Sequence, residues 1–404
     1  MAEGPLAGVR ILEFSEMIAA PFAGMHLGDL GADIIKVEPV TGEPWRLTGQ
    51  FAPNESRTFI SLNRNKRGMA IDLKSSAGQA VIHRLVLDMD VVLINYRPDT
   101  GANLGIDYET LRALNPGLIY VENTAMGRRG PQSHRPGYDL VAQAMTGLLL
   151  TGARRDEDGV PLPLTPAIAD YGTGLTMAFA VCAALFARER TGVGQKVEAT
   201  LLATSLAFQG TGFLRTGVAT GRSIEADAGA TGAAARAMNA YYRVYRTKDT
   251  MIAVACLTPA LRRKMAVALS VPDPRHERKI PVDSSEAKDI AVAYAKAVTE
   301  RFLERTTDEW LSVLDGAGVP AGPVKAIAEM ADDVQVLAND LLVEMDHPVA
   351  ERIGMVGPII RLHETPAAAQ GPSPTLGQHN DEILRELGYS GAEIGSLRDS
   401  AIIA

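Results

Sequence analysis

The sequence has only two cysteines and no unbroken apolar run of membrane-spanning length. Cys182 and Cys256 each stand among apolar residues, so we expect reduced, buried thiols rather than a disulfide framework. The longest apolar run, about 175–187, falls short of the ~20 residues that a membrane span needs, and we expect a buried helix there. No basic and apolar leader opens the chain, so we expect a cytoplasmic protein without a signal peptide and without a membrane partner.

An excess of basic residues is also missing, since the net charge is −8 over 404 residues. This argues against a nucleic-acid partner, for which a basic patch would be expected. A polyanionic ligand would have to be held by local cations, because the overall field repels it. The seven histidines show no close metal-ligand spacing, and we expect no metal site.

The N-terminal half alternates strand and helix signals, and the length of the chain suggests two domains. Short apolar strands that alternate with helices predict an α/β fold, with a doubly wound, Rossmann-like parallel sheet. Ligands collect at the carboxyl ends of such strands, which places Asn95–Arg97 in a ligand-facing loop. The expected strands are 9–14, 33–37, 91–96 and 118–122, and the expected helices are 19–30, 77–88, 108–114, 138–150 and 173–188.

A change in composition follows residue 209, where Gly, Ala and Thr dominate up to about 235. We expect a large domain over 1–210, a linker over 211–229, a smaller α+β domain over 230–330, and a linker and tail over 331–404. The small domain should hold a strand pair around Lys248 and Asp249, followed by helices at 259–269, 285–301 and 307–317. A last helix is expected over 381–387.

Asp170 is the carboxylate that the local sequence singles out. It lies in IADYGTG (168–174), at the entrance of the expected apolar helix. A helix N-terminus offers free N–H groups and a positive dipole end, which keep a carboxylate ionised, and the glycines leave room for a ligand. Asp is also a common helix cap. The local sequence leaves a cap and a nucleophile open, and frequency favours the cap.

Motifs along the rest of the chain favour the nucleophile over the helix cap at Asp170. The segments LAGVRILEF, APFAGMHLGDLGADIIKVE, LNRNKRGMAIDLKSSAG, GYDLVAQAMTGLLL, ADYGTG and RTGVGQKVEATLL follow one another in this order. With AGVPAGPV (317–324) and LGQHNDEILRELGYSGAEIGSL (376–397), they resemble the family III CoA-transferases, which share a fold with α-methylacyl-CoA racemase. The resemblance implies that Asp170 is the nucleophile, that CoA esters are substrates, and that no cofactor is bound permanently. It also implies an interlocked homodimer, in which the tail returns to the large, CoA-binding domain.

The resemblance implies a set of CoA contacts, two of them basic. They are Ile18, Ala19, Ile71, Lys74, Asn95, Tyr96, Arg97 and Tyr138. Lys66 and Arg67 are further candidates for phosphate contacts, because cationic side chains are charge-matched donors to phosphate. Pro39 and Asn103 stand where relatives have arginine, so the adenosine end is expected to be held differently. Ile18 replaces the Gln of formyl-CoA transferase and cannot donate a hydrogen bond, which disfavours oxalate chemistry.

Two alternatives remain open beside a transferase of acyl-CoA and carboxylic acids. A racemase or epimerase of this fold needs two acid/base groups at the α-carbon. Tyr138 occupies the position of the racemase histidine, and we interpret the displaced His134 as an ordinary loop residue. A non-catalytic CoA-ester-binding protein is the other alternative. Five arginines near the expected site loops weakly favour a dicarboxylate such as succinate, namely Arg46, Arg128, Arg129, Arg154 and Arg155. We expect residues 226–235 to form a lid.

Overall fold

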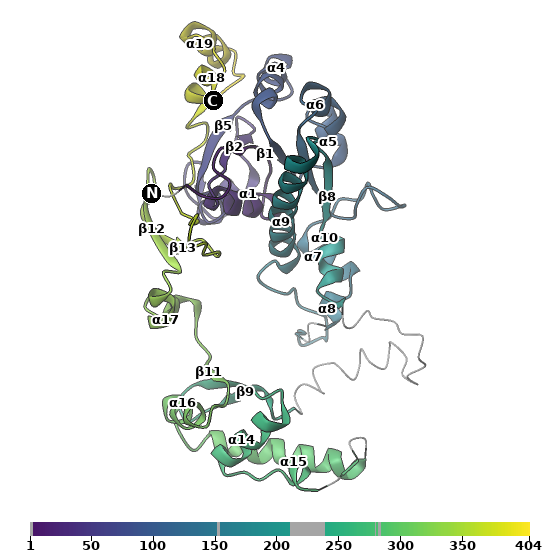
Figure 1. The fold of residues 1–404 in the computed structure, drawn as a ribbon, viewed down its shortest axis with the longest axis vertical. Coiled ribbons are helices and arrows are strands. Elements are labelled where there is room, and N and C mark those ends of the chain that lie inside the picture. The colour runs from purple at the N-terminus through teal and green to yellow at the C-terminus, as the bar shows by residue number, and fades with distance from the viewer. Residues whose placement is uncertain (1–2, 152–153, 211–238, 279, 282–283) are drawn as a thin grey trace. The chain divides into compact units, whose positions relative to one another are not determined.

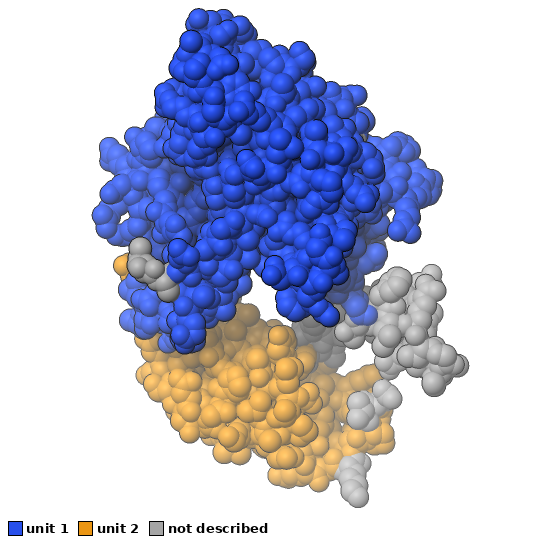
Figure 2. Space-filling model, turned by 45° about the horizontal axis from the view of Figure 1, so that its top comes forward, with its two compact units in different colours: residues 1–213, 334–404 blue, residues 214–333 orange. Residues whose placement is uncertain are grey.

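The computed structural model describes residues 3–151, 154–210, 239–278, 280–281 and 284–404. The chain divides into two compact units (Figure 2). Unit 1 comprises Met1–Phe213 and Val334–Ala404, and unit 2 comprises Leu214–Asp333. The expected linker at 211–229 and the expected lid at 226–235 lie outside the described residues.

Unit 1 is built on a six-stranded sheet in the order β5-β2-β1-β6-β7-β8, with every neighbouring pair parallel. This confirms the predicted α/β fold with a parallel sheet. From β1 the chain builds outward to β2 and β5, and then returns to place β6, β7 and β8 on the other side. The order therefore reverses between β1 and β6, which is the position where open α/β sheets bind their ligands. The strands are β1 Arg10–Phe14, β2 Asp33–Glu38, β5 Lys66–Ala70, β6 Val91–Ile94, β7 Ile119–Thr124 and β8 Lys196–Thr200.

Helices cover both faces of this sheet, because alternate strand residues point to opposite sides (Figure 1). On one face, α1 (Ala19–Asp29) and α9 (Ile168–Thr191) pack on Ile11, Leu93 and Val121. The opposite face is covered by α4 (Ser76–Leu85), α6 (Tyr108–Leu114) and two helices of the C-terminal tail. The tail helices are α18 (Asn380–Glu386) and α19 (Gly391–Asp399).

Shorter elements complete unit 1 and carry several loops of the site. They are α2 Pro44–Leu47, β3 Gln50–Ala52, β4 Glu55–Ser56, α3 Arg57–Ile60, η1 Val86–Asp88, α5 Pro98–Asn103, α7 Asp139–Met145, α8 Leu148–Thr151, α10 Leu201–Ala207, α17 Val334–Ala338, β12 Leu342–His347 and β13 Glu351–Val356.

Unit 2 is an antiparallel three-stranded sheet with helices around an aromatic core. Tyr245 and Phe302 stack with ring centroids 4.6 Å apart, and Trp310 meets Phe302 edge-on at 5.3 Å. The expected strand pair and three helices all form here. The elements are β9 Tyr242–Arg246, β10 Met251–Ala255, α14 Pro259–Leu269, η2 Pro274–His276, α15 Ser285–Phe302, α16 Thr307–Gly316, β11 Ala321–Pro323 and η3 Ile327–Ala331.

The helix α9 differs from the prediction in its start and in its burial. It begins at Ile168, five residues before the expected 173, so that Asp170 lies inside its first turn. Met177 and Val181 are fully buried against the sheet, whereas the side chains of Phe179 and Phe186 are 74% and 66% exposed. The expectation of a buried helix is therefore correct for one face only. By length and composition alone, α9 is the one described helix that could cross a membrane.

Candidate active site

A cavity opens at the carboxyl ends of β1, β6 and β7, beside the point where the strand order reverses. It brings together Asp170 and most of the predicted CoA contacts, namely Ile18, Ala19, Asn95, Tyr96, Arg97 and Tyr138. Ile71 and Lys74 do not line it. They follow β5, which is separated from β1 by β2, and Ile71 is buried and bridges to Ile403 of the tail. The cavity also holds residues that sequence reasoning did not select, among them Glu16, Met17, Asn123 and Arg135.

Asp170 does not cap α9. The N-cap position is Ala167, and the capping is done by Asp139, whose Oδ1 accepts hydrogen bonds from the backbone N–H of Ala169 at 2.8 Å and of Asp170 at 3.3 Å. The side chain of Gln143 in turn donates to Asp139 Oδ2 at 2.5 Å. Among the described residues, the Asp170 carboxylate has no hydrogen-bond or ion-pair partner. The local expectation of a cap is wrong, and the carboxylate is left free for a ligand.

Burial, together with the nearby negative charge of Asp139, raises the pKa of Asp170 to about 7. This is the opposite of the expectation that the helix end keeps the group ionised. The nearby carboxylate of Asp139 disfavours the charged form of Asp170, and no cation among the described residues pairs with Asp170 to compensate. A pKa near 7 leaves Asp170 only partly ionised at neutral pH.

The two glycines beside Asp170 serve helix packing rather than the approach of a ligand. A Cβ on Gly172 would meet the ring of Phe208 at 2.3 Å, and one on Gly174 would meet the carbonyl oxygen of Ala19 at 2.6 Å. Gly174 therefore lets the start of α1 approach α9 closely. The rings of Phe22 and Tyr171 also meet edge-on, 4.9 Å apart. The N-termini of two helices, with first-turn N–H groups that lack intrahelical partners, converge near the cavity.

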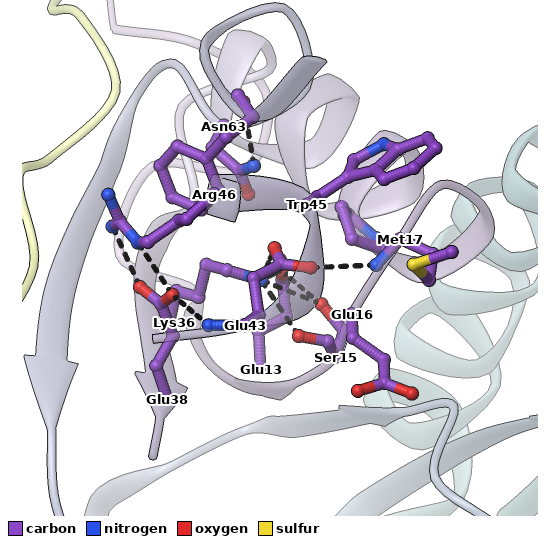
Figure 3. Close-up of polar contacts among 12 residues, drawn as sticks. Glu13, Ser15, Glu16, Met17, Lys36, Glu38, Glu43, Trp45, Arg46 and Asn63 are labelled. Carbon is purple, nitrogen blue, oxygen red and sulfur yellow. Dashed lines mark hydrogen bonds and ion pairs between the residues drawn. The ribbon is translucent and has the colours of Figure 1, made fainter. Parts of the chain in front are cut away.

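The loop from Ser15 to Ile18 follows β1, and its residues Glu16 to Ile18 line the cavity. Side chains from other parts of unit 1, Glu43 among them, hold this loop (Figure 3). Met17 has a left-handed backbone, with φ at 66°, and its N–H donates to Glu43 Oε2 at 2.8 Å. The Asn95 carboxamide accepts from the N–H of Glu16 at 3.0 Å and donates to the carbonyl of Glu16 at 2.7 Å. Both ends of the Asn95 amide thus hold this loop in place.

Four buried charged residues beneath the loop form what we call the ion-pair cluster, namely Glu13, Lys36, Glu43 and Lys66. Lys36 Nζ lies 3.0 Å from Glu43 Oε1 and donates to the carbonyl of Ser15 at 2.9 Å. Lys66 Nζ donates to Glu13 Oε1 at 2.9 Å, and its side chain has no exposed surface. Burial lowers the pKa of Lys66 to about 8. The expectation that Lys66 contacts phosphate is wrong, because it is enclosed and fully paired.

Two further cationic candidates, Arg67 and Arg46, are also paired within the protein. Arg67 pairs with Asp33 of β2 and with Glu382 and Glu386 of the tail helix α18. It therefore joins the tail to the sheet and is not a free phosphate donor. Arg46 is fully buried and pairs with Glu38 at 2.7 Å.

The remaining arginines that were expected near the substrate lie outside the cavity. Arg128 pairs with Glu122, Arg155 donates to the carbonyl of Gly159 at 2.8 Å, and neither Arg129 nor Arg154 lines the cavity. The arginines that do line it are the exposed Arg97 and Arg135. None of the five arginines expected to favour a dicarboxylate lines this cavity.

Tyr138 and His134 line the same cavity as Asp170, on the segment between β7 and α7. The side chain of Tyr138 is 62% exposed and does not hydrogen-bond the helix that it precedes. His134 is exposed, as expected of a loop histidine, but it is not remote from the site. No group of three or more His, Cys, Asp or Glu side chains suited to a metal ion occurs among the described residues. The two cysteines are free, Cys256 being buried and Cys182 partly so.

Comparison with known proteins assigns the family. The family model of CoA-transferase family III matches residues 6–380. The chain belongs to CoA-transferase family III. It is therefore an enzyme that acts on CoA thioesters, as the resemblance of its motifs predicted. This finding disfavours the non-catalytic alternative.

Named relatives are similar over nearly the whole chain. The chain is 34% identical to a succinyl-CoA:glutarate CoA-transferase of Mus musculus, over 99% of this chain and 90% of that protein. It is also 34% identical to a succinate–glutarate CoA-transferase of Agrobacterium fabrum, over 95% of this chain and 96% of that protein. Among solved structures, a CaiB/BaiF family protein from Brucella suis has a TM-score of 0.79 at 29% identity, over 95% of this chain and 100% of that one.

Proposed function

We propose that this enzyme moves CoA from succinyl-CoA, or a similar acyl-CoA, to a dicarboxylate such as glutarate, through a thioester formed on Asp170. The observation that carries the mechanism is the unpaired, poorly solvated carboxylate of Asp170 in the cavity. The choice of acids follows the relatives of the chain, two of which are named as succinate and glutarate CoA-transferases. Arg97 and Arg135 supply positive charge at the mouth of the cavity.

The reaction is a series of acyl substitutions at the carbonyl carbons of the donor, of Asp170 and of the acceptor. The ionised Asp170 oxygen attacks the thioester carbonyl of the donor and expels CoA thiolate, which leaves a mixed anhydride. The thiolate then attacks the Asp170 carbonyl, releases the donor acid and forms the aspartyl–CoA thioester. The acceptor carboxylate reverses both steps and leaves with CoA. Division into covalent steps conserves the thioester that hydrolysis would destroy. The first-turn N–H groups of α1 are available to the oxyanions.

The CoA contacts are proposed from the family resemblance and from their place in the fold. Ile18, Ala19, Asn95, Tyr96, Arg97 and Tyr138 lie at the cavity, while Ile71 and Lys74 lie farther along the same carboxyl edge of the sheet. A CoA molecule has the length to pass from Asp170 toward β5, where Lys74 is exposed and carries no ion pair within the described chain. An interlocked homodimer without a permanent cofactor completes the proposal.

The test is an exchange assay with defined donors and acceptors. The purified enzyme is incubated with succinyl-CoA and a panel of mono- and dicarboxylic acids, and the acyl-CoA products are quantified by mass spectrometry. We expect glutaryl-CoA and succinate in equal amounts, with little free CoA. A racemase would instead exchange the α-proton of a 2-methylacyl-CoA for solvent deuterium without acyl transfer. Binding of CoA esters without either reaction would support the non-catalytic alternative.

A further inference from the structure

The side chain of Asn123 is buried without a hydrogen bond at the end of β7. Only 6% of the residue is exposed, and Oδ1 is completely buried without a partner in the described part of the chain. The amide nitrogen is not among the fully buried, unpaired atoms, so it keeps some access to the cavity that Asn123 lines. A buried polar group without a partner destabilises the folded protein, because it has lost its hydrogen bonds to water. Such a group is a candidate for a ligand contact.

The alternation of side chains along β7 directs Asn123 toward the nucleophile. Ile119 and Val121 point to the face of the sheet covered by α1 and α9. Asn123, two residues on, shares that face, and it stands at the carboxyl end of the strand. Asp170 lies in the first turn of α9 on the same side and lines the same cavity. The carboxamide and the carboxylate therefore face one reaction space from two different elements.

Acyl transfer develops negative charge on the thioester oxygen, and a hydrogen-bond donor at this place would stabilise it. When Asp170 attacks the thioester, a bond forms from its oxygen to the carbonyl carbon, and the carbonyl electron pair moves onto oxygen. This oxyanion collapses when the C–S bond breaks and the electron pair leaves with the thiolate sulfur. A neutral amide N–H stabilises the oxyanion without a proton transfer, and it does not compete with Asp170 as a nucleophile.

We propose that Asn123 is a catalytic residue that donates a hydrogen bond from Nδ2 to the oxyanion formed at the donor thioester. The inference rests on the proposed acyl transfer through Asp170 and adds a residue to it. Nδ2 makes no hydrogen bond in the described part of the free enzyme, and it gains an acceptor when the reacting carbonyl arrives. Because the bond strengthens as negative charge develops on oxygen, it lowers the barrier more than it improves substrate binding.

The test replaces Asn123 with a side chain of similar size that cannot donate. Asn123→Leu should lower kcat for CoA transfer by about 10²–10³-fold, the usual effect of removing one oxyanion donor. The KM for the CoA ester should change by less than about threefold, because ground-state binding is retained. The thermal midpoint should stay level or rise, since the amide makes no hydrogen bond in the folded protein that leucine would lose.

A matched control is Ser205→Ala. Ser205, on α10, is also fully buried with an unpaired hydroxyl, but it does not line the cavity. It should leave kcat unchanged. Transfer by Asn123→Leu within threefold of the parent would overturn the inference, as would a lower kcat that comes with a matching fall in thermal stability. If the parent transfers CoA to no acid at all, the proposed function fails instead, and the two failures are thus distinguishable.

Discussion

Two groups of carboxyl residues stand at the same edge of the sheet, and they differ in whether cations accompany them. In the ion-pair cluster, Lys36 pairs with Glu13 and Glu43, Lys66 pairs with Glu13, and both lysines also donate to backbone carbonyls. At the cavity, Asp170 lies near Asp139, and neither carboxylate has a lysine or arginine partner in the described chain. Charge that is paired and enclosed fixes the loop before α1. Charge that is unpaired at a cavity is available for chemistry.

The largest effect on CoA transfer is expected from a change at Asp170. Asp170→Asn keeps the shape of the side chain but removes the nucleophilic oxygen, so we expect the exchange rate to fall by about 10⁴-fold or more. Mass spectrometry of the parent mixed with donor should show an adduct on the peptide that carries Asp170, and the variant should show none. An adduct elsewhere in the chain would move the nucleophile.

The same variant has a predicted effect on stability that depends on pH. Because the pKa of Asp170 is raised on folding, the folded state binds this proton more tightly than the unfolded state. The parent should therefore lose stability as the pH rises from about 4, the value of an ordinary Asp, to about 7, and then change no further through this group. Asp170→Asn should be more stable than the parent at pH 8. Urea unfolding at pH 5 and pH 8 measures this, and a variant that is less stable at pH 8 would contradict it.

Removal of a charge from the ion-pair cluster should destabilise the protein, whereas removal of the Asp170 charge should stabilise it at pH 8. Lys36→Met removes the cation that lies between Glu13 and Glu43, and these buried carboxylates then lack compensation. Breaking one partner out of a buried pair costs about 3–5 kcal/mol of unfolding free energy. Lys74→Met, the same substitution at an exposed lysine, should change stability by less than about 0.5 kcal/mol. Equal stabilities of the two variants would show that the cluster does not support the fold.

Sequence patterns predicted the layers of the fold well, because hydrophobic alternation survives in the final structure. The expected strand at 33–37 and helix at 108–114 became β2 and α6 almost unchanged. β5 was not predicted, since its polar Lys66 and Arg67 resemble a loop while their side chains are paired with Glu13 and Asp33. A strand that buries charged pairs has no apolar period to detect.

Only part of the candidate site could be predicted, because contacts between residues far apart in the sequence decide which charged groups are free. The position of Asp170 came from the family motif, but its free carboxylate depends on Asp139, which lies 31 residues earlier in the chain and takes over the cap. The local sequence does not show whether an Asp at a helix start caps that helix or whether a residue of another helix caps it instead. Lys66 was misassigned because the sequence shows its charge and not its enclosure. Asn123 gave no signal at all, since its importance rests on the absence of a partner.

Asp139 permits a smaller and more specific change. Burial is the first cause of the raised pKa of Asp170, and the charge of Asp139 is the second. Asp139→Asn removes that charge, so the acid limb of the kcat/KM profile, which should lie near pH 7 in the parent, should move to lower pH. It should stay above the ordinary Asp range because burial persists. Asp158→Asn, a control at an exposed carboxylate, should leave the acid limb at the pH of the parent. An acid limb that also stays in place in Asp139→Asn would show that the charge of Asp139 does not raise the pKa of Asp170.

The smallest effect is expected at Arg97, which is exposed at the cavity and proposed to contact a phosphate of CoA. A solvated ion pair contributes little, so Arg97→Ala should raise the KM for the CoA ester by only about three- to fivefold. It should leave kcat nearly unchanged, because the phosphate does not alter its charge during the reaction and such uniform binding appears in KM. The difference between parent and variant should shrink in ~1 M salt, where the Debye length is about 3 Å. Arg97→Lys keeps the charge and should recover most of the affinity. A variant whose kcat falls while its KM stays constant would place Arg97 at the reacting carbonyl and not at the distant end of CoA.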